Sequence, residues 1–307
     1  MKALFIGGLM LVSAPLLGGC ATAPAEPTGV KNVAAHAPAF TSDRISVQTV
    51  GEGPDVILIP GLSSTPDVWK STVDAVPGYR YHLVHVNGFA GKPVGANATG
   101  PFLDPVAHEI ARYITAKNLK APTLVGHSLG GSLAMRVATH HPESVGKLMV
   151  VDMFPFMGLM FGGPQATPES VKPAAEAVRT GMTSGDDAAR KARIEQTIAG
   201  MVKTESMRAE AIDDSLTSDK VVSSQAMYDL ITTDLRADLP NFKGPMEVLW
   251  VYPPNAPVAE PVYEQFFVQS YKNAPQATVK KIPDAYHFLM WDNPAAWQAE
   301  LKAFLAK

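Results

Sequence analysis

Ser128 is the residue whose neighbours best suit it to act as a nucleophile. It is the centre of Gly126-His127-Ser128-Leu129-Gly130, which follows a short apolar run at residues 122–125 and precedes a helical pattern that ends near residue 141. A sharp turn from strand to helix would hold the central serine in a strained conformation with its hydroxyl exposed. Free amides and the positive end of the helix dipole would favour negative charge developing beside it. The pentapeptide therefore predicts acyl-transfer chemistry at a serine.

A nucleophilic serine needs a general base, and His287 is the strongest candidate. An imidazole titrates near neutrality, so it can take the Ser128 proton and return it to a leaving group. Among the eight histidines, His287 is the one expected in a loop between a strand and the last helix. We interpret His127 and the pair His140-His141 as packing or surface residues of the turn and its helix.

The segments around these residues alternate between strand and helix patterns. Strands are expected at residues 44–50, 55–59, 81–86, 122–125, 147–151, 245–252 and 277–282, and a hairpin turn at 51–54. Helices are expected at residues 66–76, 104–117, 128–141 and 294–306. This alternation predicts an α/β fold with right-handed crossovers and a mostly parallel sheet that carries helices on both faces.

A different pattern interrupts the alternation after residue 154. Residues 154–161 are apolar, aromatic and rich in methionine, and helical stretches follow until about residue 239. We therefore expect a core made of residues 41–154 and 244–307 and an inserted helical cap at residues 155–243. The methionine-rich entry suits an apolar acyl or alkyl pocket of adaptable shape, and it equally suits packing of the cap against the core.

The first twenty residues have the pattern of an export signal. Lys2 precedes an apolar run at residues 3–17 that is too short to span a bilayer comfortably, and Leu17-Gly18-Gly19-Cys20 follows. This end is similar to a bacterial lipobox, in which the cysteine is lipidated and becomes the new N-terminus. The alternative is an ordinary signal peptide cut near Ala23. We expect a lipoprotein signal peptide at residues 1–19 and a flexible tether, rich in Ala, Pro and Thr, at residues 20–40.

The lipid on Cys20 would make the membrane a partner of this protein. Ala21 after the cysteine is similar to the outer-membrane sorting pattern, so the expected location is the bacterial cell envelope, on the outer membrane and facing the periplasm. Cys20 is the only cysteine, which excludes a disulfide within the chain.

Composition narrows the remaining classes of function. The chain has 307 residues, of which 46% are hydrophobic and 18% charged, with a formal charge of −3. This fits one large globular domain or a domain with an insertion, and no basic stripe indicates a nucleic-acid partner. No cluster of His, Cys and Asp has metal-ligand spacing, so neither a metal nor another cofactor is expected. The oligomeric state stays open.

Three segments in this order resemble the α/β-hydrolase fold family over nearly all of residues 41–307. They are Ile59-Pro60-Gly61-Leu62-Ser63 after an early strand, the pentapeptide around Ser128, and residues 287–294, His-Phe-Leu-Met-Trp-Asp-Asn-Pro. The last is similar to a segment of lactonase-like and haloperoxidase-like hydrolases. The resemblance implies a nucleophile elbow at Ser128, a general base at His287, and an oxyanion hole formed by the backbone N–H groups of Leu62 and Leu129.

The carboxylate that completes the triad is where this sequence departs from the commonest pattern of the family. Most relatives carry aspartate after the strand expected here at residues 245–252, but that position is Ala256, and no carboxylate follows before Glu260. Some branches place the acid at the end of the preceding strand, where this chain has Asp152. We expect Asp152 to be the acid, with Glu260 and Asp284 as alternatives and a capping role for Asp152 as a further possibility.

These residues favour a serine hydrolase that cleaves carboxylic esters of small or apolar substrates through an acyl-serine intermediate. Serine at the nucleophile position argues against dehalogenase and epoxide hydrolase chemistry, which need a carboxylate there. Lactonase, C–C hydrolase, aminopeptidase and perhydrolase reactions use the same triad and remain open. A lipoprotein that keeps the fold only for binding is the alternative from a different class.

Overall fold

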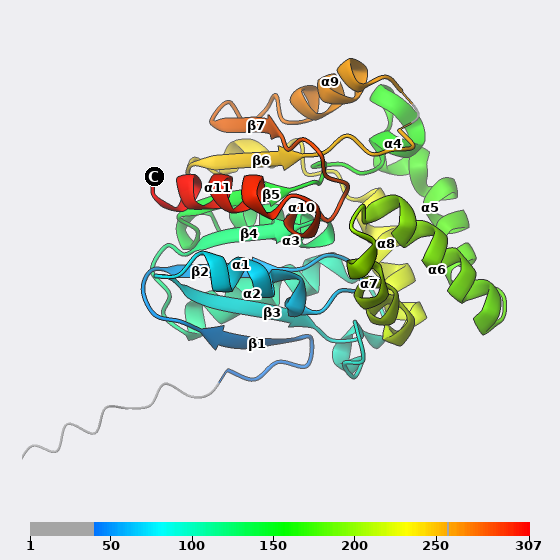
Figure 1. Ribbon diagram of the computed structural model, residues 1–307, viewed down its shortest axis with the longest axis horizontal. Coiled ribbons are helices and arrows are strands. Elements are labelled where there is room, and N and C mark those ends of the chain that lie inside the picture. The colour runs from blue at the N-terminus through cyan, green and yellow to red at the C-terminus, as the bar shows by residue number, and fades with distance from the viewer. Residues whose placement is uncertain (1–39, 257) are drawn as a thin grey trace, which may run out of the picture. The chain divides into compact units, whose positions relative to one another are not determined.

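A seven-stranded sheet forms the centre of the protein, whose computed structural model describes residues 40–256 and 258–307 (Figure 1). The strands are β1 (Ile45–Val50), β2 (Asp55–Ile59), β3 (Arg80–Val86), β4 (Thr123–His127), β5 (Lys147–Val151), β6 (Met246–Trp250) and β7 (Ala277–Lys281). They lie in the order β1-β3-β2-β4-β5-β6-β7, and every neighbouring pair is parallel except β1 with β3. The expectation of a mostly parallel sheet is confirmed.

Successive side chains of a strand point to opposite faces of the sheet, and in the central strands both sets are apolar and buried. In β2, Ile57 and Ile59 pack into one hydrophobic core, whereas Val56 and Leu58 pack into the other. A strand that is covered on both faces is expected to have a nearly continuous apolar sequence, and residues 55–59 have such a sequence. Strand β1 is half exposed and lies at the edge of the sheet, where polar side chains can face water.

The expected hairpin at residues 51–54 is wrong. Strand β1 pairs antiparallel with β3, with Ile45 opposite Val86, and not with β2, which follows it directly in the chain. Strand β2 instead lies between β3 and β4, parallel to both. Burial decides the outcome, because the apolar β2 can be covered on both faces only in the interior of the sheet.

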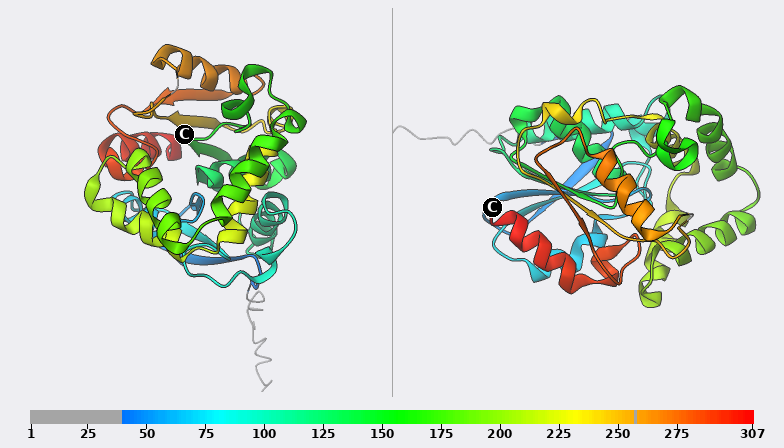
Figure 2. Two further views of the ribbon diagram at one scale, coloured as in Figure 1. Left: turned by 90° about the vertical axis from the view of Figure 1, so that its right-hand side faces the viewer. Right: turned by 90° about the horizontal axis from the view of Figure 1, so that it is seen from above.

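Helices cover both faces of the sheet (Figure 2). Outside the segment between β5 and β6 they are α1 (Lys70–Ala75), α2 (Leu103–Ala116), α3 (Leu129–His140), α9 (Glu260–Ser270), α10 (Leu289–Asp292) and α11 (Pro294–Leu305), with short 3₁₀ turns η1 (Pro66–Trp69), η2 (Gly95–Ala98) and η3 (Pro142–Ser144). Helices α2, α3 and α9 share one hydrophobic core with the sheet, and α1, α10 and α11 share the other. Helix α9 was not predicted from the sequence.

The segment between β5 and β6 is helical and lies beyond the carboxyl ends of the parallel strands (Figure 1). Its helices are α4 (Leu159–Gly162), α5 (Pro168–Thr183), α6 (Asp187–Met201), α7 (Glu205–Thr217) and α8 (Lys220–Thr232), with turns η4 (Gly163–Gln165) and η5 (Leu239–Asn241). They fall within residues 155–243, the range expected for a cap, and we call them the inserted helices. Side chains of Thr167, Asp186 and Asp219 cap the first turns of α5, α6 and α8.

Two expectations for the N-terminal region concern residues outside the described part of the chain. The proposed signal peptide at residues 1–19 and Cys20 lie there, as does the tether apart from residue 40. Within the described ranges, none of the helices combines the length and the apolar composition that crossing a membrane requires.

Candidate active site

Ser128 occupies the sharp turn between β4 and α3. Its backbone has φ of +54° and ψ of −124°, and its N–H donates to the Val151 carbonyl over 2.9 Å. Such a conformation costs a non-glycine residue about 1–3 kcal/mol, so the surroundings must impose it. A Cβ on Gly126 would lie 2.1 Å from the Gly130 carbonyl oxygen, and one on Gly130 would lie 2.2 Å from the Ile59 carbonyl oxygen. The turn therefore requires glycine at both positions.

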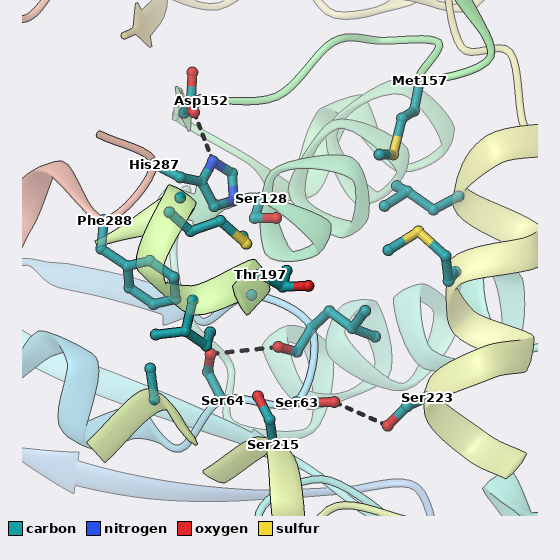
Figure 3. Close-up of a pocket in the computed structure, with 18 of the residues that line it drawn as sticks. Ser63, Ser64, Ser128, Asp152, Met157, Thr197, Ser215, Ser223, His287 and Phe288 are labelled. Carbon is teal, nitrogen blue, oxygen red and sulfur yellow. Dashed lines mark hydrogen bonds and ion pairs between the residues drawn. The ribbon is translucent and has the colours of Figure 1, made fainter. Parts of the chain in front are cut away.

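His287 and Asp152 form the closest polar contact in the site. Asp152 Oδ2 lies 2.5 Å from His287 Nδ1, and both side chains are mostly buried. The opposite edge of the imidazole faces Ser128 (Figure 3). In the described residues the Ser128 hydroxyl makes no direct hydrogen bond to the ring, a gap that commonly closes when substrate binds. The three side chains come from the ends of β4 and β5 and from the loop after β7.

The backbone after β5 fixes the orientation of the Asp152 carboxylate. Asp152 has φ of +49°, a left-handed conformation that aspartate tolerates better than most residues. Its N–H donates to the Leu249 carbonyl over 2.7 Å, and its Oδ1 accepts from the Val251 N–H over 3.2 Å. With Oδ1 held by the residue that follows β6, Oδ2 points at the imidazole.

The structure brings neither alternative carboxylate to His287. Glu260 is the first residue of α9 and forms an ion pair with Lys281. Asp284 is exposed, and its carbonyl oxygen accepts from Lys203 Nζ. Neither hydrogen-bonds to His287, whose carboxylate partner among the described residues is Asp152.

His127 supports the loop that carries His287 in a way that the sequence did not reveal. It is fully buried, and its ring lies 4.6 Å from the His287 ring between centroids. Its Nε2 lies 2.9 Å from the His287 carbonyl oxygen, so Nε2 carries the proton and donates. Burial, and secondarily the nearby His287, hold the pKa of His127 well below its usual value. A neutral His127 therefore anchors the backbone of His287.

The amides of Leu62 and Leu129 have the freedom that an oxyanion hole requires. Leu129 is the first residue of α3, and half-buried Leu62 lies in the loop after β2. Neither N–H donates to an acceptor within the described residues. The structure therefore leaves both amides without a hydrogen-bond partner in the described part of the chain, as an oxyanion hole requires.

Ser128, Asp152 and His287 line a cavity of about 740 Å³. This volume is within the range of pockets for small molecules. Much of the wall is apolar and consists of Met153, Phe154, Met157, Met182, Met201 and Met227. Hydroxyl groups gather on another side, where Figure 3 shows Ser63, Ser64, Thr197, Ser215 and Ser223.

Two tyrosines close to Asp152 add to its enclosed surroundings. Burial, with a smaller effect of the Asp152 charge, raises the pKa of Tyr263 and Tyr271, so both phenols are neutral. Tyr271 donates to the Met153 carbonyl over 2.6 Å.

In residues 40–256 and 258–307, no group of three His, Cys, Asp or Glu side chains is arranged to hold a metal ion.

Comparison with known proteins identifies the family. Residues 56–301 match the model of the alpha/beta hydrolase family, and the chain belongs to that family. The predicted fold class is thereby confirmed.

Relatives of known function include esterases that match only part of the chain. The pimeloyl-[acyl-carrier protein] methyl ester esterase of Vibrio atlanticus (strain LGP32) is 35% identical over 115 residues, which cover 37% of this chain and 42% of that protein. Among solved structures, an esterase from Exiguobacterium antarcticum superposes with a TM-score of 0.72 at 19% identity, covering 86% of this chain and 96% of the other. The enol-lactonase from Burkholderia xenovorans LB400 gives 0.67 at 16% identity, with coverage of 86% and 96%. These structural likenesses show the fold.

Proposed function

We propose that this protein is a serine hydrolase that cleaves carboxylic esters with an apolar acyl or alkyl portion through an acyl-serine intermediate. The observation that carries the proposal is the 2.5 Å contact between Asp152 and His287 at a ring whose other edge faces Ser128. Esterases among the curated relatives support ester hydrolysis, although the match spans 42% of the first relative's length.

The proposed reaction uses each group in turn. Ser128 Oγ attacks the ester carbonyl carbon while His287 Nε2 takes its proton, and Asp152 stabilises the imidazolium that forms. The carbonyl oxygen becomes an oxyanion, to which the N–H groups of Leu62 and Leu129 donate. The C–O bond then breaks, and the departing alkoxide takes the proton from His287. Water, activated by the same imidazole, releases the acid and restores Ser128.

The apolar wall of the cavity determines the expected substrate preference. Burial of each methylene contributes about 0.8 kcal/mol, which corresponds to about fourfold in binding. We therefore expect kcat/KM for p-nitrophenyl esters to rise with acyl length until the methionine-lined part of the cavity is filled.

The test is Ser128→Ala assayed on a short-chain p-nitrophenyl ester. The variant should fold normally and lose nearly all turnover, because the residual oxyanion hole retains only a small part of the acceleration. Ser132→Ala is the matched control, since Ser132 is buried on α3, the helix that Ser128 precedes, but does not line the cavity. Turnover by Ser128→Ala at the rate of the control would contradict the proposal.

We also propose that a lipid on Cys20 anchors the enzyme in the bacterial cell envelope, on the outer membrane and facing the periplasm. Support comes from the Leu17-Gly18-Gly19-Cys20 segment and from Ala21.

A further inference from the structure

The loop that carries the Leu62 amide is held by the inserted helices. We call residues 61–65 the β2 loop. Within it, Ser63 has φ of +57°, a conformation that costs a serine free energy and persists only where neighbours enforce it. Two hydrogen bonds lie within the loop, from the Ser64 N–H to the Gly61 carbonyl and from Ser64 Oγ to the Leu62 carbonyl, and both are long, at 3.3 Å and 3.4 Å. The β2 loop therefore depends on contacts from elsewhere for its shape.

The first such contact joins Ser63 to helix α8. The hydroxyl oxygens of Ser63 and Ser223 lie 2.8 Å apart, and both side chains are buried (Figure 3). Breaking this pair would leave one buried hydroxyl without its partner, which is costlier than losing an exposed hydrogen bond. The two residues are 160 positions apart in the chain.

The second contact joins Thr65 to helix α7. Asp214 Oδ2 accepts from the Thr65 backbone N–H over 2.8 Å and from Thr65 Oγ1 over 3.1 Å. A carboxylate oxygen that accepts two hydrogen bonds from one residue fixes both its backbone and its side chain. The β2 loop is thus attached to two inserted helices, at its middle and at its end.

We propose that Ser223 and Asp214 are positioning residues, through which α8 and α7 hold the β2 loop so that the Leu62 N–H stays aimed at the oxyanion. The inserted helices would then control the rate of the chemical step as well as the shape of the cavity. This inference rests on the proposed function, because it assigns Leu62 to the oxyanion hole.

The expected effect is a fall in kcat with little change in KM. Removal of one oxyanion donor lowers kcat about 10²- to 10³-fold, and a displaced donor should cost part of that. We therefore expect Ser223→Ala and Asp214→Ala each to lower kcat about 10- to 100-fold. The ground-state carbonyl uses the donor less than the oxyanion does, so KM should stay within about twofold.

Matched variants separate this role from general damage to the helices. Ser224→Ala removes a buried hydroxyl from the same helix, but Ser224 Oγ donates to Val221 of its own helix over 3.0 Å. Asp213→Ala removes the exposed neighbour of Asp214. Both controls should keep wild-type kcat. Asp214→Asn keeps a carbonyl oxygen as acceptor and should restore most of the activity that Asp214→Ala loses.

A double-mutant cycle tests whether the two hydroxyls act as one unit. If Ser223 acts through Ser63, then Ser63→Ala combined with Ser223→Ala should be no slower than the slower single variant. Multiplicative losses would contradict the proposal.

Amide hydrogen exchange supplies a readout that needs no turnover. The Ser64 and Thr65 amides should exchange faster in Ser223→Ala and Asp214→Ala than in Ser224→Ala and Asp213→Ala. If these two variants exchange faster but the wild-type protein hydrolyses no ester, the attachment is sustained and the proposed function is rejected. In an active enzyme, unchanged exchange, an unchanged kcat, or a raised KM at constant kcat would overturn the inference.

Discussion

Asp152→Asn is the substitution that tests the triad most selectively. Asparagine has nearly the same shape as aspartate and also tolerates the left-handed backbone at φ of +49°. The carbonyl oxygen of the new amide can keep the bond from the Val251 N–H at the place of Oδ1. Its NH₂ group would then stand 2.5 Å from His287 Nδ1, where a carboxylate oxygen lies now. A donor at that place favours the tautomer with the proton on Nε2, which cannot accept the Ser128 proton.

The loss in kcat should therefore be large. Exchange of a triad aspartate for asparagine costs about 10⁴ in kcat, and the Asp152 contact has the geometry for the full effect. KM should change little, because the interaction strengthens mainly when the imidazolium forms. Steady-state kinetics on a p-nitrophenyl ester would measure both constants, and urea unfolding would show that the variant keeps its fold.

Two other carboxylates serve as controls for Asp152. Glu260→Gln loses an exposed ion pair with Lys281, and Asp284→Asn alters an exposed side chain, so both should keep kcat within about twofold of wild type. The triad assignment would be refuted if Asp152→Asn kept kcat within about tenfold of wild type, or if either control lost activity to the same extent.

Three further predictions concern stability and location. Burial keeps the pKa of His127 below the usual 6.5, so as the pH falls the unfolded chain protonates this imidazole before the folded protein does. The free energy of unfolding therefore decreases below pH 6.5, by up to about 1.4 kcal/mol per pH unit. His127→Gln should flatten the slope of unfolding free energy between pH 6.5 and about 5 in urea titrations, and an unchanged slope would contradict this. Gly126→Ala should lower the free energy of unfolding by about 3 kcal/mol or more, because its Cβ would collide with the Gly130 carbonyl. Gly181→Ala is the control: its Cβ would meet nothing within 4 Å, so it should raise the free energy of unfolding by up to about 1 kcal/mol. Equal stabilities of the two variants would refute the steric argument. Cys20→Ser should remove the protein from the detergent-extracted membrane fraction, whereas unchanged fractionation with an unlipidated N-terminus at residue 23 or 24 would favour an ordinary signal peptide.

The sheet could be predicted from local patterns, but its pairing could not. Continuous apolar runs such as residues 55–59 identify strands buried on both faces, and their alternation with helices indicates a parallel sheet. The position of β1 was missed because a turn between consecutive strands is compatible with a hairpin, and only the competition for the interior places β2 next to β3 and β4. Helix α9 was missed because it follows a proline-rich segment and mixes apolar and polar residues without a clear helical period.

Some residues of the candidate site could likewise be predicted from local sequence, and others could not. Ser128 and His287 lie in contiguous motifs, and Asp152 ends a recognisable strand, so each has a local signal. Ser223 and Asp214 have none, because their contacts with the β2 loop join segments about 150 residues apart. The role of His127 is hidden for the same reason, since its partner is the backbone of His287.

The most direct test of the central claim is to find which residue a fluorophosphonate modifies. The reagent should form one covalent adduct with the intact protein, and peptide mass spectrometry should locate it on Ser128. Ser128→Ala should remain unlabelled, and Asp152→Asn should react much more slowly, because the carboxylate that holds His287 in the tautomer able to accept the Ser128 proton is gone. An adduct on a different residue, or ester hydrolysis by a wild-type protein that resists labelling, would contradict the account.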